Sequence, residues 1–258
     1  MSRSLRISSH SFVCVMAASL GCAPSNDRAV RPLGPQLPPV NAPSSVARQA
    51  FGAKGTATRK DNTLITNVDA SQGSLVGISG VSGLPLRGVD FVGARIPIRY
   101  QDGQDALAVV SDWRSPTGSH DYFRLLSAEG TEICGTEDDG QPIWAIVVPT
   151  VFDLTTGRET TDSALYTIAC HGGAIAQCIE YGYRTWDSAT ETYDNSTQTR
   201  SLAPYHAACV AMIRADYCGD GQAHSLIGAV IDLRDALGIH QDAKLGTTDP
   251  MWGPWLAE

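Results

Sequence analysis

Basic charge is scarce in this chain of 258 residues. The sequence holds 19 lysines and arginines against 27 aspartates and glutamates, which gives a formal net charge of −8 at pH 7. A protein of that sign has no electrostatic reason to bind the phosphate backbone of nucleic acid or a surface of anionic lipid. The composition therefore excludes a nucleic-acid-binding function, and we expect no nucleic-acid partner.

Patterns that mark common active sites and metal sites are also missing. No serine lies in a G-x-S-x-G elbow, since GAKGTAT (52–58) and GISGVSG (77–83) both break that pattern. The cysteines form no paired C-x2-C knuckles, and the acidic segment TEDDG (136–140) lacks the spacing of an EF-hand. We therefore expect no catalytic residues, no metal ligands and no cofactor.

The chain has no long hydrophobic run either. After a basic head with Arg3 and Arg6, the apolar stretch 12–21 (FVCVMAASLG) is too short to span a membrane and is typical of a secretory signal. The Gly-Cys junction that follows matches the last two positions of a bacterial lipobox, in which the cysteine is lipidated and becomes the mature N-terminus. We predict a lipoprotein-type signal peptide over residues 1–21 with lipid attachment at Cys22. Ordinary cleavage nearby, without a lipid, is the alternative.

Residues 22–50 hold little that a core could bury and much proline. The stretch from Ala23 to Pro43 contains six of the fourteen prolines, which is typical of an extended, disordered tether. Because residue 23 is Ala rather than Asp, the sequence carries no obvious inner-membrane retention signal. We therefore expect an exported protein of the cell envelope, anchored in the outer membrane through its N-terminal lipid.

Residues 51–97 are rich in glycine and show a five-residue rhythm. An apolar residue closes each unit of five between residues 72 and 96, namely Val76, Val81, Leu86, Phe91 and Ile96. This spacing resembles pentapeptide-repeat proteins, whose chain coils as a β-helix with one inward apolar residue per side. Five units make little more than one coil, and an irregular Gly-rich hairpin is the equal alternative. In either case the segment should pack against the domain that follows.

Residues 98–258 are predicted to form an α+β domain with a mixed sheet and two helices. β-rich runs separated by turn residues predict strands at RIPIRY, DALAVVSDW, DYFRLL, IWAIVV and SALYTIAC, and another over 226–233. One helix is expected over 172–182, after two glycines. The other is expected over 204–218, with a proline in its first turn and Gly219 after its end. Strands around two helices indicate the α+β class.

The segment RADYCGDG (214–221), with TIACHGGAIAQC (167–178) and GYRTW (182–186) upstream, resembles the ADYC domain. This bacterial family is named for four residues that are here Ala215, Asp216, Tyr217 and Cys218. The likeness covers roughly residues 98–240. It implies an extracytoplasmic domain that is often carried by lipoproteins. The family has no assigned activity, so the resemblance supplies no catalytic residues.

The five cysteines beyond the tether are expected to form disulfides in an oxidising compartment. On one helix, Cys209 and Cys218 would have Cα atoms about 13 Å apart, whereas a disulfide needs them within about 7 Å. Cys170 and Cys178 meet the same difficulty on the first helix, so each pair should cross to the other and staple the helices together. Antiparallel helices would give Cys170–Cys218 and Cys178–Cys209, which we favour, and parallel helices would give Cys170–Cys209 and Cys178–Cys218. Cys134 is left without a partner.

Three classes of function remain open. A hydrolase would use Cys170 or Cys209 as nucleophile with His171 or His206 as base, but a disulfide-bonded sulfur cannot attack a substrate. A binding module would present aromatic residues to an envelope glycan or peptide, and the tryptophans are Trp113, Trp144, Trp186, Trp252 and Trp255. A structural or interaction role at the cell envelope is the interpretation that we favour. The sequence leaves the oligomeric state open.

Overall fold

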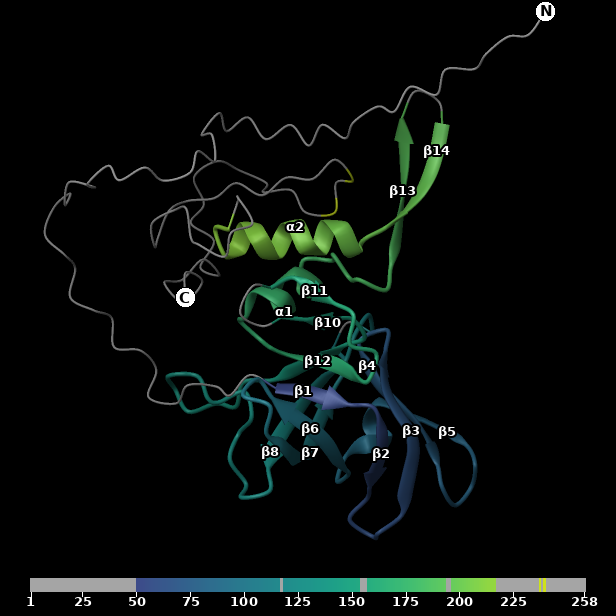
Figure 1. The fold of residues 1–258 in the computed structure, drawn as a ribbon, viewed down its shortest axis with the longest axis vertical. Helices are drawn as coiled ribbons and strands as arrows, with labels where there is room; N and C mark the ends of the chain where they lie inside the picture. The colour runs from purple at the N-terminus through teal and green to yellow at the C-terminus, as the bar shows by residue number, and fades with distance from the viewer. Residues whose placement is uncertain are drawn as a thin grey trace, which may run out of the picture. The chain divides into compact units, whose positions relative to one another are not determined.

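The computed structural model describes residues 50–116, 118–153, 157–193 and 196–216, together with residues 237 and 239. Strands dominate this part of the chain, and the α-helices within it are α1 (Ala174–Glu180) and α2 (Ala203–Ile213) (Figure 1). The signal peptide and nearly all of the expected tether lie outside these residues, as do Cys22, Cys218 and the strand expected over 226–233.

Six antiparallel strands close into a barrel. In ring order they are β1 (Ala50–Ala53), β12 (Leu165–Cys170), β9 (Ala145–Val148), β8 (Tyr122–Ser127), β7 (Asp105–Arg114) and β6 (Arg95–Tyr100). β1 closes the ring because it pairs with β12 on one side and with β6 on the other, so that Ala50 lies opposite both Ile168 and Tyr100.

The predicted α+β fold with a mixed sheet is therefore wrong, because the described chain is mostly β and its barrel is antiparallel throughout. The strand that closes the barrel lies at residues 50–53, where composition indicated the end of a tether and a glycine-rich segment. The two short helices pack outside the barrel, so they do not form a layer of an α+β sandwich.

Closure at β1 depends on a glycine. Gly52 lies opposite Tyr166 of β12 in the strand register, and a Cβ atom on residue 52 would lie 1.9 Å from Cζ of that tyrosine. Tyr166 is fully buried, so its ring occupies the space that a larger residue at position 52 would need. β1 therefore fits between β6 and β12 only with glycine at this position.

Four more strands extend the sheet beyond β6, namely β2 (Gly55–Thr58), β3 (Leu64–Ser71), β4 (Ser74–Ser79) and β5 (Pro85–Arg87), and the short 3-10 helix η1 (Gly88–Phe91) follows them. The expected pentapeptide-like coil is not formed. Val81, which should point inward in such a coil, is 81% exposed, whereas Phe91 and Ile96 are fully buried. Residues 51–97 instead share one sheet and one apolar core with the barrel strands.

α1 packs on the outer face of the barrel next to β12, and α2 packs against α1 (Figure 1). Ile179 of α1 and Val210 of α2 share a buried cluster with Ile146 of β9 and Ala169 of β12. Two small hairpins complete the described chain: β10 (Val151–Phe152) pairs with β11 (Glu159–Thr160), and β13 (Ser188–Tyr193) pairs with β14 (Ser196–Ser201).

The second helix is shorter than the range 204–218 that its pattern predicted. α2 ends at Ile213, with Arg214 as its C-cap, and Ala215 has a φ of +55°. That left-handed conformation ends a helix. The ADYC motif therefore begins beyond α2, and the helical distance that was used to separate Cys209 from Cys218 does not apply.

Candidate functional site

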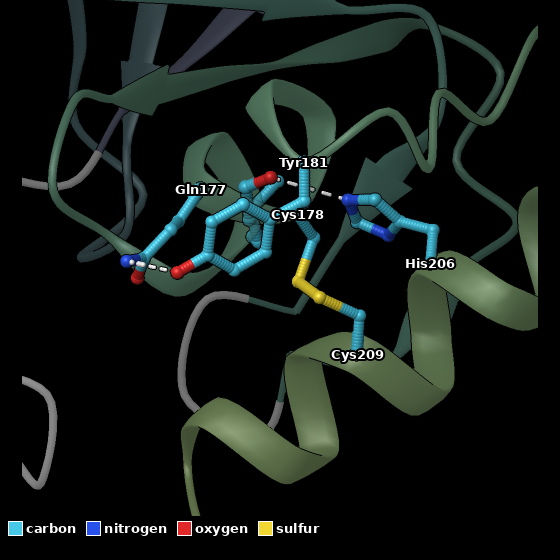
Figure 2. Close-up of a disulfide and its surroundings, with 6 residues drawn as sticks. Gln177, Cys178, Tyr181, His206 and Cys209 are labelled. Atoms are coloured by element: carbon cyan, nitrogen blue, oxygen red, sulfur yellow. Dashed lines mark hydrogen bonds between the residues drawn. A yellow bond between two sulfur atoms is a disulfide. The ribbon is translucent and has the colours of Figure 1, made fainter. Parts of the chain in front are cut away.

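Cys178 and Cys209 form a disulfide that joins α1 to α2 (Figure 2). Their Cα atoms lie 5.9 Å apart, and both residues are buried. This is one of the two bonds that the favoured pairing expects. Because its sulfur is held in this bond, Cys209 has no thiolate with which to attack a substrate.

Cys170 forms its disulfide with Cys134 rather than with Cys218, so that predicted pair is corrected. The Cα atoms of Cys134 and Cys170 lie 5.4 Å apart. Cys170 is the last residue of β12 and not part of a helix, and the pairing of β12 with β9 sets it opposite Ala145. Cys134 lies in the connection between β8 and β9, so strand pairing brings these two cysteines together. Cys134 is therefore not the unpaired residue that the spacing suggested.

His206 lies beside the Cys178–Cys209 bond and is fully buried (Figure 2). Its Nε2–H donates to the carbonyl oxygen of Ile175 at 3.2 Å, while its Nδ1 has no hydrogen-bond partner among the described residues. Burial lowers the pKa of His206 to about 4, because it removes the imidazolium from water. His206 is therefore neutral at pH 7 and faces the protein interior, which does not suit a general base.

A group of charged and aromatic side chains surrounds the end of α1. The Tyr122 hydroxyl donates to Glu180 Oε1 at 2.9 Å, and Nδ1 of His171 donates to the same oxygen at 2.7 Å. The hydrogen bond to Glu180 raises the pKa of His171, and burial raises the pKa of Tyr122. The guanidinium of Arg114 stacks on the Tyr122 ring, 4.9 Å from its centroid. These groups satisfy one another, so His171 holds α1 to the barrel.

A polar pocket opens between the β3–β4 turn, η1 and the loop that joins β7 to β8. We define it by the residues that carry its polar groups and its floor, namely Gln72, Arg87, Gly88, Trp113, His120 and Asp121. Its volume of about 350 Å³ lies in the range of small-ligand sites, about 300–1,000 Å³. The backbone amide of Asp121 donates to the carbonyl oxygen of Gly73 at 2.9 Å, which holds the loop against the turn.

Two buried polar atoms of the pocket have no hydrogen-bond partner among the described residues. They are the indole Nε1 of Trp113 and the Nε2 of His120. His120 is only 6% exposed, its Nδ1 lies 3.1 Å from the Ser119 hydroxyl, and burial lowers its pKa. A buried polar group without a partner costs about 1–3 kcal/mol. Because both residues line one cavity, this cavity is the candidate site for a polar ligand.

The third polar group of the pocket is the carboxylate of Asp121. This residue is 8% exposed and accepts a hydrogen bond from the Ser74 hydroxyl. Gly88, with a φ of +52°, packs closely against it. A Cβ atom on Gly88 would lie 2.8 Å from Oδ2 of Asp121 and 2.9 Å from Nε1 of Trp113. Only glycine therefore fits here, and its backbone lies beside both a hydrogen-bond acceptor and a hydrogen-bond donor.

The other features that the sequence singled out do not form a site. Trp113, Trp144 and Trp186 are each half-buried, and Trp252 and Trp255 lie outside the described residues, so no exposed aromatic row is seen in the described part. Within the same part, no group of three or more His, Cys, Asp or Glu residues could hold a metal ion. The described helices are neither long nor apolar enough to cross a membrane.

A family model for the ADYC domain matches residues 88–255. The chain belongs to the ADYC domain family. This match confirms the resemblance carried by residues 214–221, and neither the curated proteins nor the solved structures yielded a match to the chain. The two disulfides of this ADYC domain fit a protein that folds outside the cytoplasm, where such bonds form and persist.

Sequence reasoning missed the polar pocket of this ADYC domain. Its residues come from three segments that are far apart in the chain, near residues 72, 88 and 113–121, and only the fold brings them together. The one local signal is the polar run Ser119–His120–Asp121 directly before a β-rich run. In the sequence it is indistinguishable from a solvated turn, yet His120 and Asp121 are buried.

Proposed function

We propose that this ADYC-domain chain is an exported lipoprotein, anchored in the outer membrane through Cys22, whose β-barrel domain has an interaction role at the cell envelope. The observation that carries the proposal is the pair of disulfides. Cys134–Cys170 ties the β8–β9 connection to the barrel, and Cys178–Cys209 ties α1 to α2. A reducing cytoplasm would not maintain such bonds, and the lipobox-like junction at Cys22 supplies the route to the envelope.

An interaction role fits the described side chains better than catalysis does. The two cysteines considered as nucleophiles, Cys170 and Cys209, are both held in disulfides. His206 is buried against α1, and His171 is paired with Glu180. The residues of the polar pocket, in contrast, include two polar groups that have no hydrogen-bond partner within the described part of the chain. This observation favours the binding of an envelope glycan or peptide as the form that the interaction takes.

The anchor is tested by replacing the cysteine that would be lipidated. The chain carrying Cys22→Ser should lose incorporation of a labelled fatty acid and should leave the membrane fraction, whereas the unaltered chain should keep both. Cys14→Ser is the matched control, because Cys14 lies inside the apolar stretch and should be removed with the signal peptide. A mature N-terminus without acyl groups in the unaltered chain would contradict the proposal, as would equal fatty-acid labelling of the Cys22→Ser variant.

A further inference from the structure

We propose that the polar pocket binds a neutral sugar residue of an envelope glycan. The inference rests on the interaction role proposed above, for which it names the class of ligand, but it does not depend on the lipid anchor. It starts from Trp113 Nε1 and His120 Nε2, two buried atoms that have no hydrogen-bond partner among the described residues. Both residues line the pocket together with Asp121.

The three groups together match the hydrogen bonding of hydroxyls. The indole N–H of Trp113 can only donate, and the carboxyl oxygens of Asp121 serve as acceptors. Nε2 of His120 can either donate or accept a hydrogen bond. The tautomer is free to change because the Ser119 hydroxyl at Nδ1 can itself accept or donate. A sugar hydroxyl donates and accepts at the same time, so hydroxyls of one sugar could accept from the indole and donate to the carboxylate.

The charge of the pocket argues against an ionic ligand. An anion would have to approach the buried side chain of Asp121, and a cation would meet the exposed residue Arg87 at the rim. A neutral ligand with several hydroxyls avoids both costs.

The wall of the pocket also offers apolar surface. The half-buried indole of Trp113 and the side chain of Val89, which is 54% exposed, both line it. A sugar ring has C–H faces that can cover such surface while its hydroxyls reach the polar groups. An aromatic residue that combines an apolar body with one N–H donor suits this kind of mixed contact.

The test uses the full chain carrying Cys22→Ser, titrated with glucose, galactose, mannose and N-acetylglucosamine while its tryptophan indole N–H resonances are followed by NMR. At least one sugar should shift one indole resonance in a saturable manner, and that resonance should be absent from the Trp113→Phe variant. Trp113→Phe keeps an aromatic ring but removes the donor, so the affinity measured from the sugar signals should fall about tenfold.

Two further variants keep the test decisive. Trp144→Phe makes the same change at a half-buried tryptophan that does not line the pocket, and it should leave the affinity unchanged. Gln72→Asn shortens an exposed amide at the rim and tolerates the φ of +50° found there, so it should fold normally and weaken binding. The proposal is overturned if no sugar shifts the Trp113 resonance, if Trp144→Phe weakens binding as much as Trp113→Phe, or if acetate or ethanolamine binds more tightly than every sugar.

A second arm separates the two envelope sources of such a sugar. The same chain is incubated with purified peptidoglycan and with purified lipopolysaccharide, and the monosaccharide is added as competitor. If one polymer retains the chain and the free sugar releases it, the proposal is supported and that polymer is the source of the sugar. If neither polymer retains the chain, the assignment to an envelope glycan is overturned. Because the Cys22→Ser chain is used throughout, a failure of sugar binding leaves the result on the lipid anchor untouched.

Discussion

Nε2 of His206 on α2 donates a hydrogen bond to the carbonyl oxygen of Ile175 on α1 at 3.2 Å, so it joins the same two helices as the Cys178–Cys209 disulfide (Figure 2). The imidazole also lies against the ring of Phe152, with the two ring centroids 4.9 Å apart. Burial between these groups removes the imidazolium from water, which lowers the pKa of His206 to about 4.

The free energy of unfolding should therefore fall in mild acid. In the unfolded chain His206 binds a proton near its ordinary pKa of about 6.5, but in the folded chain it does so only near 4. Between these values the unfolded state binds more protons, so stability is lost as the pH falls through this window, by about 3 kcal/mol at pH 4. Urea unfolding at a series of pH values measures this loss.

The matched comparison is His206→Gln, which replaces the imidazole by an amide that can still donate a hydrogen bond but does not titrate. It should lower stability at pH 7 and flatten the decline between pH 6.5 and 4. His171, whose pKa is raised by Glu180, has a linkage of the opposite sign, stabilising the fold at low pH and losing that effect as the pH rises. Because His171 is present in both proteins, its contribution to the pH dependence of stability cancels in the comparison. An equally steep decline in His206→Gln would rule out His206 as the cause.

The sequence pattern was sufficient for most individual strands. Alternation in RIPIRY and DALAVVSDW placed β6 and β7, and the apolar runs IWAIVV and SALYTIAC contain β9 and β12. The existence of two helices also followed from their flanking glycines and proline. The local pattern predicts these strands because burial of one face produces alternation of apolar and polar residues, and burial of both faces produces a continuous apolar run.

Closure of the barrel and the end of α2 could not be predicted in the same way. β1 is four residues long and is defined by its partners β6 and β12 rather than by any pattern of its own. The turn at Ala215 uses a left-handed conformation that is uncommon for alanine, so no glycine marks it. The pairing of Cys170 with Cys134 followed from the register of β9 and β12, which helical spacing could not show.

Substitution at the barrel seam should be costly. Gly52→Ala would set a methyl group into the ring of Tyr166, so we expect a loss of about 3 kcal/mol from overpacking. Tyr166→Leu removes the clashing ring and should also destabilise by itself, because it leaves space in the core. The double variant should then be less destabilised than the sum of the two single variants. Additive losses in denaturant titrations would show that the two residues do not compete for one space.

Each disulfide should contribute measurably to stability. Cys134–Cys170 closes a sequence separation of 36 residues and Cys178–Cys209 one of 31, and the chain-entropy model assigns about 4 kcal/mol to either. Replacing both cysteines of one bond by alanine should lower the melting temperature by roughly 10 °C. Gln198→Ala, a change at an exposed position, is the control and should have little effect. A double-alanine variant that melts with the Gln198→Ala control would contradict the assigned role.

The connectivity itself can be read from one non-reduced tryptic digest. Cleavage after arginine leaves Cys170 and Cys178 together on peptide 159–184, while the remaining cysteines lie on separate peptides, Cys134 on 125–158, Cys209 on 201–214 and Cys218 on 215–234. The structure predicts one linked species of three peptides, 125–158, 159–184 and 201–214. The pairing first favoured from helical spacing would instead link 159–184 to 201–214 and 215–234. The two species differ in mass, so a linked product that contains 215–234 in place of 125–158 would overturn the Cys134–Cys170 bond, and a thiol reagent that labels Cys134 in the unreduced protein would do the same.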